Sequence, residues 1–117
     1  MIQHAVQDKF ATANGLRFHY REWGNEGEPP LVLLHGVTGH ARVWNRFART
    51  MADGFRVLAL DQRGHGETDW GDAYSTELMA RDVDAFTHEL RLHSFALLGH
   101  SMGGPTPTAS RPAILLH

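Results

Sequence analysis

The sequence contains no cysteine, which excludes disulfides, thiolate metal sites and cysteine nucleophiles. No uninterrupted apolar run exceeds four residues, whereas a membrane-spanning helix needs about 20, and the first ten residues lack the apolar stretch of a signal peptide. The formal net charge is only −2, with the basic residues scattered, so no charged surface favours nucleic acid or an anionic membrane. These absences predict a soluble, cytoplasmic protein with neither kind of partner.

The composition is that of an ordinary globular protein. Of the 117 residues, 42% are hydrophobic and 21% are charged, which is enough apolar material for one modest core. We find no internal repeat and no domain linker. Residues 1–117 are therefore expected to form a single domain.

An antiparallel hairpin is predicted near the N-terminus. Asn14-Gly15 is a strong two-residue turn signal inside residues 10–22, and the residues that follow it alternate between apolar and polar. The apolar set is Leu16, Phe18 and Tyr20, and the polar set is Arg17, His19 and Arg21.

Three short apolar runs, residues 31–34, 55–60 and 95–98, predict strands that are buried on both faces. Since these strands should lie side by side, five of their residues are expected to share one core: Leu33, Val57, Leu58, Leu97 and Leu98.

Helical periodicity occupies the intervals between these runs. The first predicted helix begins at Ala41 and stops at Gly54, with one buried stripe of Trp44, Phe47, Ala48 and Met51. The second predicted helix is capped by Ser75, and the negative charge of Glu77 in its first turn interacts favourably with the helix dipole. Its buried face is formed by Met79, Val83, Phe86 and Leu90. Alternating strands and helices predict an α/β fold with a mostly parallel sheet, begun by the antiparallel hairpin.

This regularity fails in the last segment. Pro105, Pro107 and Pro112 fall where a helix is due, and each interior proline costs a helix roughly 3 kcal/mol. Residues 113–116 are a candidate strand, although the ten residues from 102 to 111 are about the minimum for a parallel crossover.

Gly99-His100-Ser101-Met102-Gly103 matches the Gly-x-Ser-x-Gly nucleophile elbow. The motif alone is weak, but it directly follows the buried run 95–98, where a sharp turn would raise the Ser101 hydroxyl above the edge of the sheet. Its two glycines favour such a turn because side chains there would collide with neighbouring backbone.

Polar segments also follow the other two buried runs. His35-Gly36-Val37 follows residues 31–34, and Asp61-Gln62-Arg63-Gly64-His65-Gly66 follows residues 55–60. The carboxyl ends of parallel strands are where open α/β sheets bind ligands. The three segments are therefore expected to meet at one edge.

In this order, the His-Gly turn, the Asp-x-Arg-Gly-x-Gly loop and Gly-His-Ser-Met-Gly-Gly resemble the α/β-hydrolase family over roughly residues 10–104. The resemblance implies that Ser101 is the nucleophile and that the Val37 and Met102 amides form the oxyanion hole. It also implies that His35 and Gly36 support the pocket, and that Asp61 pairs with Arg63 to hold their loop. His65 either lines the pocket or faces solvent.

The implied substrate is a small carboxylic ester or related acyl compound, handled without a cofactor. Family members with an aspartate nucleophile, the dehalogenases and epoxide hydrolases, are disfavoured because position 101 is serine. Perhydrolase, haloperoxidase or C–C hydrolase chemistry on the same nucleophile remains an alternative for the parent protein.

The sequence gives little support for a metal site or for a dinucleotide-binding fold. The pairs His35/His40 and His88/His93 lack the spacing of a His-Glu-x-x-His zinc site, so no metal site is predicted. Gly64-His65-Gly66 begins a dinucleotide fingerprint, but Asp69 occupies its third glycine position.

The acid and base of the triad follow the serine in this family's chain order. The residues after Ser101 include no aspartate or glutamate and a single histidine, His117, which has no acid to orient it. We therefore expect residues 1–117 to be a partial domain in which residues 105–117 depart from the family pattern. The chain by itself is expected to have little hydrolase activity. Alternatively, it is a non-catalytic fragment that self-associates through an exposed sheet edge at the nucleophile strand.

Overall fold

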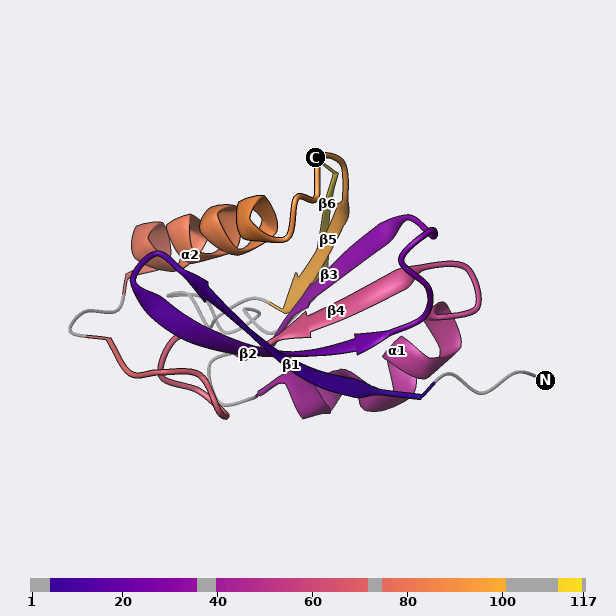
Figure 1. The fold of residues 1–117 in the computed structure, drawn as a ribbon, viewed down its shortest axis with the longest axis horizontal. Coiled ribbons are helices and arrows are strands. Elements are labelled where there is room, and N and C mark those ends of the chain that lie inside the picture. The colour runs from indigo at the N-terminus through magenta and orange to yellow at the C-terminus, as the bar shows by residue number, and fades with distance from the viewer. Residues whose placement is uncertain (1–4, 36–39, 72–74, 101–111, 117) are drawn as a thin grey trace.

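A computed structural model describes residues 5–35, 40–71, 75–100 and 112–116. Six strands form one sheet in the order β1-β2-β4-β3-β5-β6 (Figure 1). The α/β architecture predicted from the sequence is confirmed. None of the helices in these four ranges is long and apolar enough to cross a membrane. The cytoplasmic location stays a prediction.

The hairpin joins β1 (Gln7–Ala13) to β2 (Leu16–Trp23), as predicted. Asn14 and Gly15 have φ values of 49° and 79°, so both turn residues adopt the left-handed conformation that asparagine and glycine tolerate best. β2 then pairs antiparallel with β4 (Arg56–Leu60), which attaches the hairpin to the sheet.

β3 (Pro30–Leu34) pairs in parallel with β4 on one side and with β5 (Ala96–His100) on the other. These are the three predicted apolar strands. Each is buried on both faces because a helix covers each side of the sheet.

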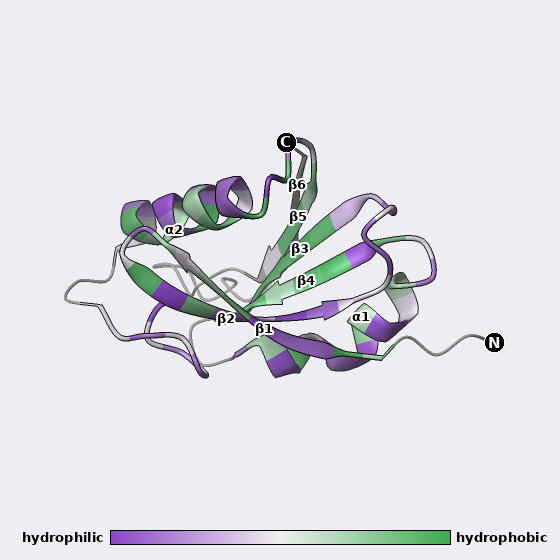
Figure 2. Cartoon of the chain, in the orientation of Figure 1, coloured by the Kyte–Doolittle hydropathy of each residue, from purple (hydrophilic) through white to green (hydrophobic). Residues whose placement is uncertain are grey.

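The strand residues expected to share one core are all buried, but they divide between two. Leu58 and Leu97 pack with α2 (Thr76–Glu89), whereas Leu33, Val57 and Leu98 lie on the opposite face with α1 (Asn45–Met51). The prediction of a single core was wrong because successive strand residues point to opposite faces. Figure 2 shows the apolar central strands between the two helices.

The predicted first helix has two parts. A 3₁₀ turn, η1 (Ala41–Trp44), precedes α1, which ends at Met51 rather than at Gly54. Trp44 and Ala48 are buried as expected, whereas Phe47 is 37% exposed. In α2 the Ser75 hydroxyl accepts the Leu78 amide at 3.1 Å, which confirms the predicted cap, and Val83 and Phe86 are buried.

The last strand, β6 (Pro112–Leu116), pairs antiparallel with β5. An antiparallel neighbour needs no crossover, which explains how so short a connection suffices. β5, the strand that precedes the predicted nucleophile, is therefore not the edge that the sequence predicted, because β6 covers it. Self-association stays a prediction, with β6 as the strand that would carry it on this side.

Candidate active site

The three parallel strands end level with one another. Leu34, at the end of β3, pairs with Leu60 at the end of β4 and with Gly99 near the end of β5. The segments after these strands therefore start from one edge of the sheet, as predicted. Ser101, Met102 and Gly103 of the elbow, and Gly36 and Val37 of the predicted oxyanion hole, lie outside the described residues.

The described part of the elbow is the end of β5, where Gly99 and His100 are strand residues. A Cβ atom added at Gly99 would lie 3.4 Å from the Leu34 Cβ, which is van der Waals contact rather than overlap. Among the described residues no atom lies closer to such a Cβ, and the role of Gly99 in the turn stays a prediction.

His35 connects the end of β3 to the loop after β4. It is fully buried, its Nε2 accepts the Gln62 amide at 2.9 Å, and its carbonyl accepts the Gln62 side-chain amide at 2.8 Å. Because Nε2 accepts, a neutral His35 ring carries its proton on Nδ1. The His65 ring packs 4.9 Å from the His35 ring, so His65 is partly buried at the same edge.

Asp61 is the central acceptor of the loop after β4, and it is 2% exposed. Its carboxylate accepts the amides of Ala41 at 2.5 Å and Glu67 at 3.0 Å, and it pairs with His19 Nδ1 at 2.6 Å. Burial is the largest influence and raises the pKa of Asp61, but the two amides and His19 together outweigh it and lower this pKa. Asp61 is therefore a structural carboxylate that ties η1 and β2 to the loop.

The predicted pairing of Asp61 with Arg63 is wrong. Arg63 instead forms a two-point ion pair with Asp82 of α2, at 2.7 Å and 2.9 Å, and both side chains are buried. The hairpin turn joins them, because the Asn14 side chain donates to Asp82 at 2.8 Å. The two charged residues of the loop thus have separate partners on different elements.

Gly66 is required by this arrangement. Its φ is +54°, and a Cβ atom there would overlap the Asp61 side chain. The loop turns back over Asp61 only because position 66 has no side chain.

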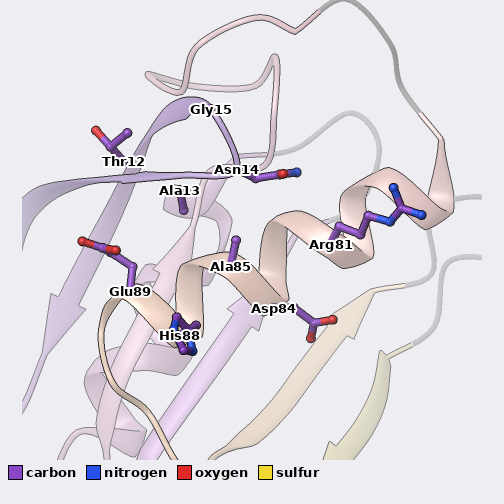
Figure 3. A pocket seen from close by; sticks show the side chains of 9 residues that line it. All are labelled: Thr12, Ala13, Asn14, Gly15, Arg81, Asp84, Ala85, His88 and Glu89. Carbon is purple, nitrogen blue, oxygen red and sulfur yellow. The ribbon is translucent and has the colours of Figure 1, made fainter.

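A hollow of about 660 Å³ lies away from these strand ends, between the hairpin turn and the outer side of α2 (Figure 3). Its lining is mixed in charge, with Arg81, Asp84, His88 and Glu89 pointing from the helix. None of the predicted site residues lines it.

A family model described as the alpha/beta hydrolase fold matches residues 29–109. The chain belongs to the α/β-hydrolase family. This membership agrees with the sheet order, with its three parallel strands, and with the motifs that follow them.

Individual proteins of the family show the same similarity. The chain is 40% identical over 94 residues to the N-formylmaleamate deformylase of Pseudomonas putida, covering 79% of this chain and 35% of the relative. It is 36% identical over 94 residues to the human epoxide hydrolase 4, covering 78% and 26%. A crystal structure of a membrane phospholipase A, described as a bacterial virulence factor, superimposes with a TM-score of 0.80 at 31% identity, covering 84% and 32%. The chain thus spans only about a quarter to a third of these α/β-hydrolases.

Two residues that hold this loop, His19 and Asp82, are not among the site residues that the sequence predicts. Strand alternation placed His19 on a polar face, but it is 1% exposed, with the Phe10 ring of β1 and the Asp61 and Glu67 side chains of the loop after β4 lying against it. A signal existed for Asp82: it is an acid next to Val83, on the predicted buried stripe of its helix. A charge at such a position requires a buried partner.

Proposed function

We propose that this chain carries the nucleophile of a serine hydrolase that acts on carboxylic esters or related acyl compounds. The observation that supports this most directly is that the Gly-His-Ser-Met-Gly motif begins in β5, where Gly99 and His100 are the last two residues. The end of β5 is level with the ends of β3 and β4 in the α/β-hydrolase sheet. A serine that directly follows such a strand would stand at the edge where open α/β sheets bind ligands.

In the proposed reaction the Ser101 oxygen attacks the acyl carbon while its proton passes to a general base. The carbonyl oxygen becomes negatively charged in the tetrahedral intermediate. The amides of Val37 and Met102 would donate hydrogen bonds to it, and one such donor typically contributes about 2.7–4 kcal/mol to the transition state. The intermediate then expels the alcohol or amine, and water releases the acyl group from the serine.

The buried residues at this edge have a supporting role in the proposal. His35 holds the end of β3 against the loop after β4, Asp61 holds that loop against β2 and η1, and Arg63 holds it against α2. A rigid edge of this kind would fix the oxyanion donors relative to the serine, and preorganised donors are the main source of such stabilisation.

The acid and the base are the unassigned parts of the machinery. The 16 residues from 102 to 117 contain no carboxylate side chain and one histidine. We therefore propose that the remaining triad residues belong to the part of the α/β-hydrolase that these 117 residues do not include. The 117-residue chain alone would then turn over esters poorly.

A chimera tests the proposal. Residues 1–103 would replace the matching segment of the N-formylmaleamate deformylase, so that the relative supplies the rest of the fold. We expect the chimera to hydrolyse a carboxylic ester at a measurable rate. This rate should fall at least about 1,000-fold in Ser101→Ala, because a triad loses most of its catalytic power without its nucleophile. The matched control, Ser94→Ala, should hydrolyse the substrate as fast as the unchanged chimera.

Intact-mass analysis of the same chimera after treatment with a fluorophosphonate separates serine chemistry from epoxide hydrolysis. A phosphonyl adduct present in the control and absent from Ser101→Ala supports the acyl-transfer mechanism. A folded, active chimera whose hydrolysis is unchanged by Ser101→Ala would refute it.

A further inference from the structure

Three ligand-type side chains converge on the outer part of the sheet, far along the chain from the elbow. Asp8 comes from β1, His19 from β2, and Glu67 from the loop after β4. The His19 Nε2 atom lies 2.8 Å from Asp8 Oδ1 and 3.5 Å from Glu67 Oε2, and the three ligand atoms all lie within 4.8 Å of one another.

The hydrogen bonds of Asp61 determine which nitrogen of His19 faces this cluster with a lone pair. Backbone amides only donate, so the Asp61 oxygens that contact Ala41 and Glu67 act as acceptors. The remaining bond, at 2.6 Å, is then a donation from His19 Nδ1 to Asp61. In the neutral ring the proton is thus on Nδ1, and the lone pair of Nε2 points at Asp8 and Glu67.

Three acceptors at these distances repel one another unless a cation lies between them. The cation is either a second proton on the ring or a metal ion. Two further features distinguish this cluster from a group of surface acids. His19 is 1% exposed and therefore held in one orientation, and the carboxylate behind its other nitrogen is the arrangement that metal-binding histidines typically have.

We propose that Asp8, His19 and Glu67 form a binding site for a divalent transition metal ion of the zinc type. Imidazole with two carboxylates is a suitable ligand set for such ions, and water would complete a tetrahedron. Ligand atoms around a tetrahedral zinc ion lie about 3.4 Å apart, given bonds of about 2.0–2.2 Å. The separation of 3.5 Å between His19 and Glu67 fits this, and the 2.8 Å separation from Asp8 needs a small outward shift. The Asp8 side chain is 45% exposed and has room to move.

The charges around the site are close to balanced before the ion binds. Arg21 lies 3.4 Å from Asp8, and Arg42 lies 3.8 Å from Glu67, so two guanidinium groups offset the carboxylates of Asp8 and Glu67, while Asp61 pairs with the His19 ring. The Arg42 side chain is 52% exposed and can turn away. Arg21 is buried and stays, which favours a site of moderate rather than extreme affinity.

A metal ion here would link three parts of the chain: the outer strand, its neighbour and the loop that follows β4. The loop is the one that Asp61 and Arg63 also hold. The ion would therefore stiffen the edge of the sheet that carries the proposed active site, from outside that site.

Cobalt(II) provides the direct test, because its visible absorption reports four-coordinate binding. The 117-residue chain would be titrated with Co²⁺ and then with Zn²⁺ as competitor, with ¹⁵N NMR of the His19 ring in the Zn²⁺-saturated chain. We expect four-coordinate absorption that Zn²⁺ displaces, with Nδ1 protonated and Nε2 bound to the metal.

Asp8→Asn and Glu67→Gln should each weaken Co²⁺ binding at least about tenfold, while Asp84→Asn, which removes an exposed carboxylate from α2, should leave it unchanged. Both ligand variants change partly exposed side chains, and circular dichroism checks their folding. Equal affinity in the wild type and in a folded ligand variant would overturn the proposal. So would a His19 ring that keeps both protons at saturating Zn²⁺, since the cation would then be the proton.

Discussion

The buried ion pair between Arg63 and Asp82 allows the sharpest test of how the loop after β4 is held. We consider Asp82→Asn, which keeps the size of the side chain and removes its charge. The exposed fractions of the Arg63 and Asp82 side chains are 6% and 3%, so water cannot replace what the substitution removes. The Asp82 carboxylate accepts two bonds from Arg63 and one from Asn14, and an amide has one oxygen for these three donors.

Removing one partner of a buried pair leaves the other charge uncompensated, which costs about 3–5 kcal/mol. Globular proteins have unfolding free energies of roughly 0.05–0.15 kcal/mol per residue, or about 6–18 kcal/mol for a chain of this length. Asp82→Asn should therefore remove a large share of the total.

Urea unfolding followed by tryptophan fluorescence measures the loss, with Arg46→Met as an exposed control that should shift the free energy by less than about 0.5 kcal/mol. The double variant Arg63→Met/Asp82→Leu should recover most of the stability, because apolar replacement of both partners of a buried pair is often neutral. A loss below about 1 kcal/mol in Asp82→Asn, or a double variant as unstable as the single one, would refute the assignment of a buried, structurally required pair.

Three further outcomes follow from the fold and the site. The pKa of Asp61 is lower in the folded chain than its ordinary value of 3.8, so its contribution to stability is present above about pH 4 and is lost as the pH falls through the folded pKa. The urea midpoint should therefore fall less steeply between pH 7 and pH 3 in Asp61→Asn than in the wild type, and parallel curves would contradict this. Leu97→Ala should destabilise the chain by roughly 2–5 kcal/mol in the same urea assay, since Leu97 packs in the core beneath α2, and a change under about 0.5 kcal/mol would show that this core is not formed. Finally, the 117-residue chain should hydrolyse a short-chain nitrophenyl ester hardly faster than Ser101→Ala does, because a serine without an oriented base is a weak nucleophile; robust Ser101-dependent turnover would implicate His117 or a second chain.

Most of the strand framework could be predicted because each element carries a local signal. The Asn14-Gly15 turn, the three apolar runs and the Ser75 cap depend on nearby residues only, and all appear where the sequence predicts them. The division of the core between two faces was also available in principle, since it follows from the two-residue period of a strand.

The contacts that hold the site could not be predicted in the same way, because they join residues far apart in the sequence. Arg63 has an acid two positions before it and another 19 positions after it, and only the fold shows that the distant one is its partner. The direction of the last strand, β6, was likewise not determined by its local sequence. A short connection is a weak argument against a strand when that strand can run antiparallel, as β6 does.

The hairpin attachment has a consequence for where the domain begins. The family model starts at residue 29, so its match does not include the hairpin of β1 and β2. Nevertheless two hairpin side chains donate hydrogen bonds to the rest of the domain, Asn14 to Asp82 and His19 to Asp61, and β2 covers the outer edge of β4. A polypeptide shortened to begin at the family boundary would expose that strand edge to other chains and leave two buried carboxylates short of a donor. Expression trials and domain swaps with this chain should therefore set the N-terminal boundary before residue 7, where β1 starts.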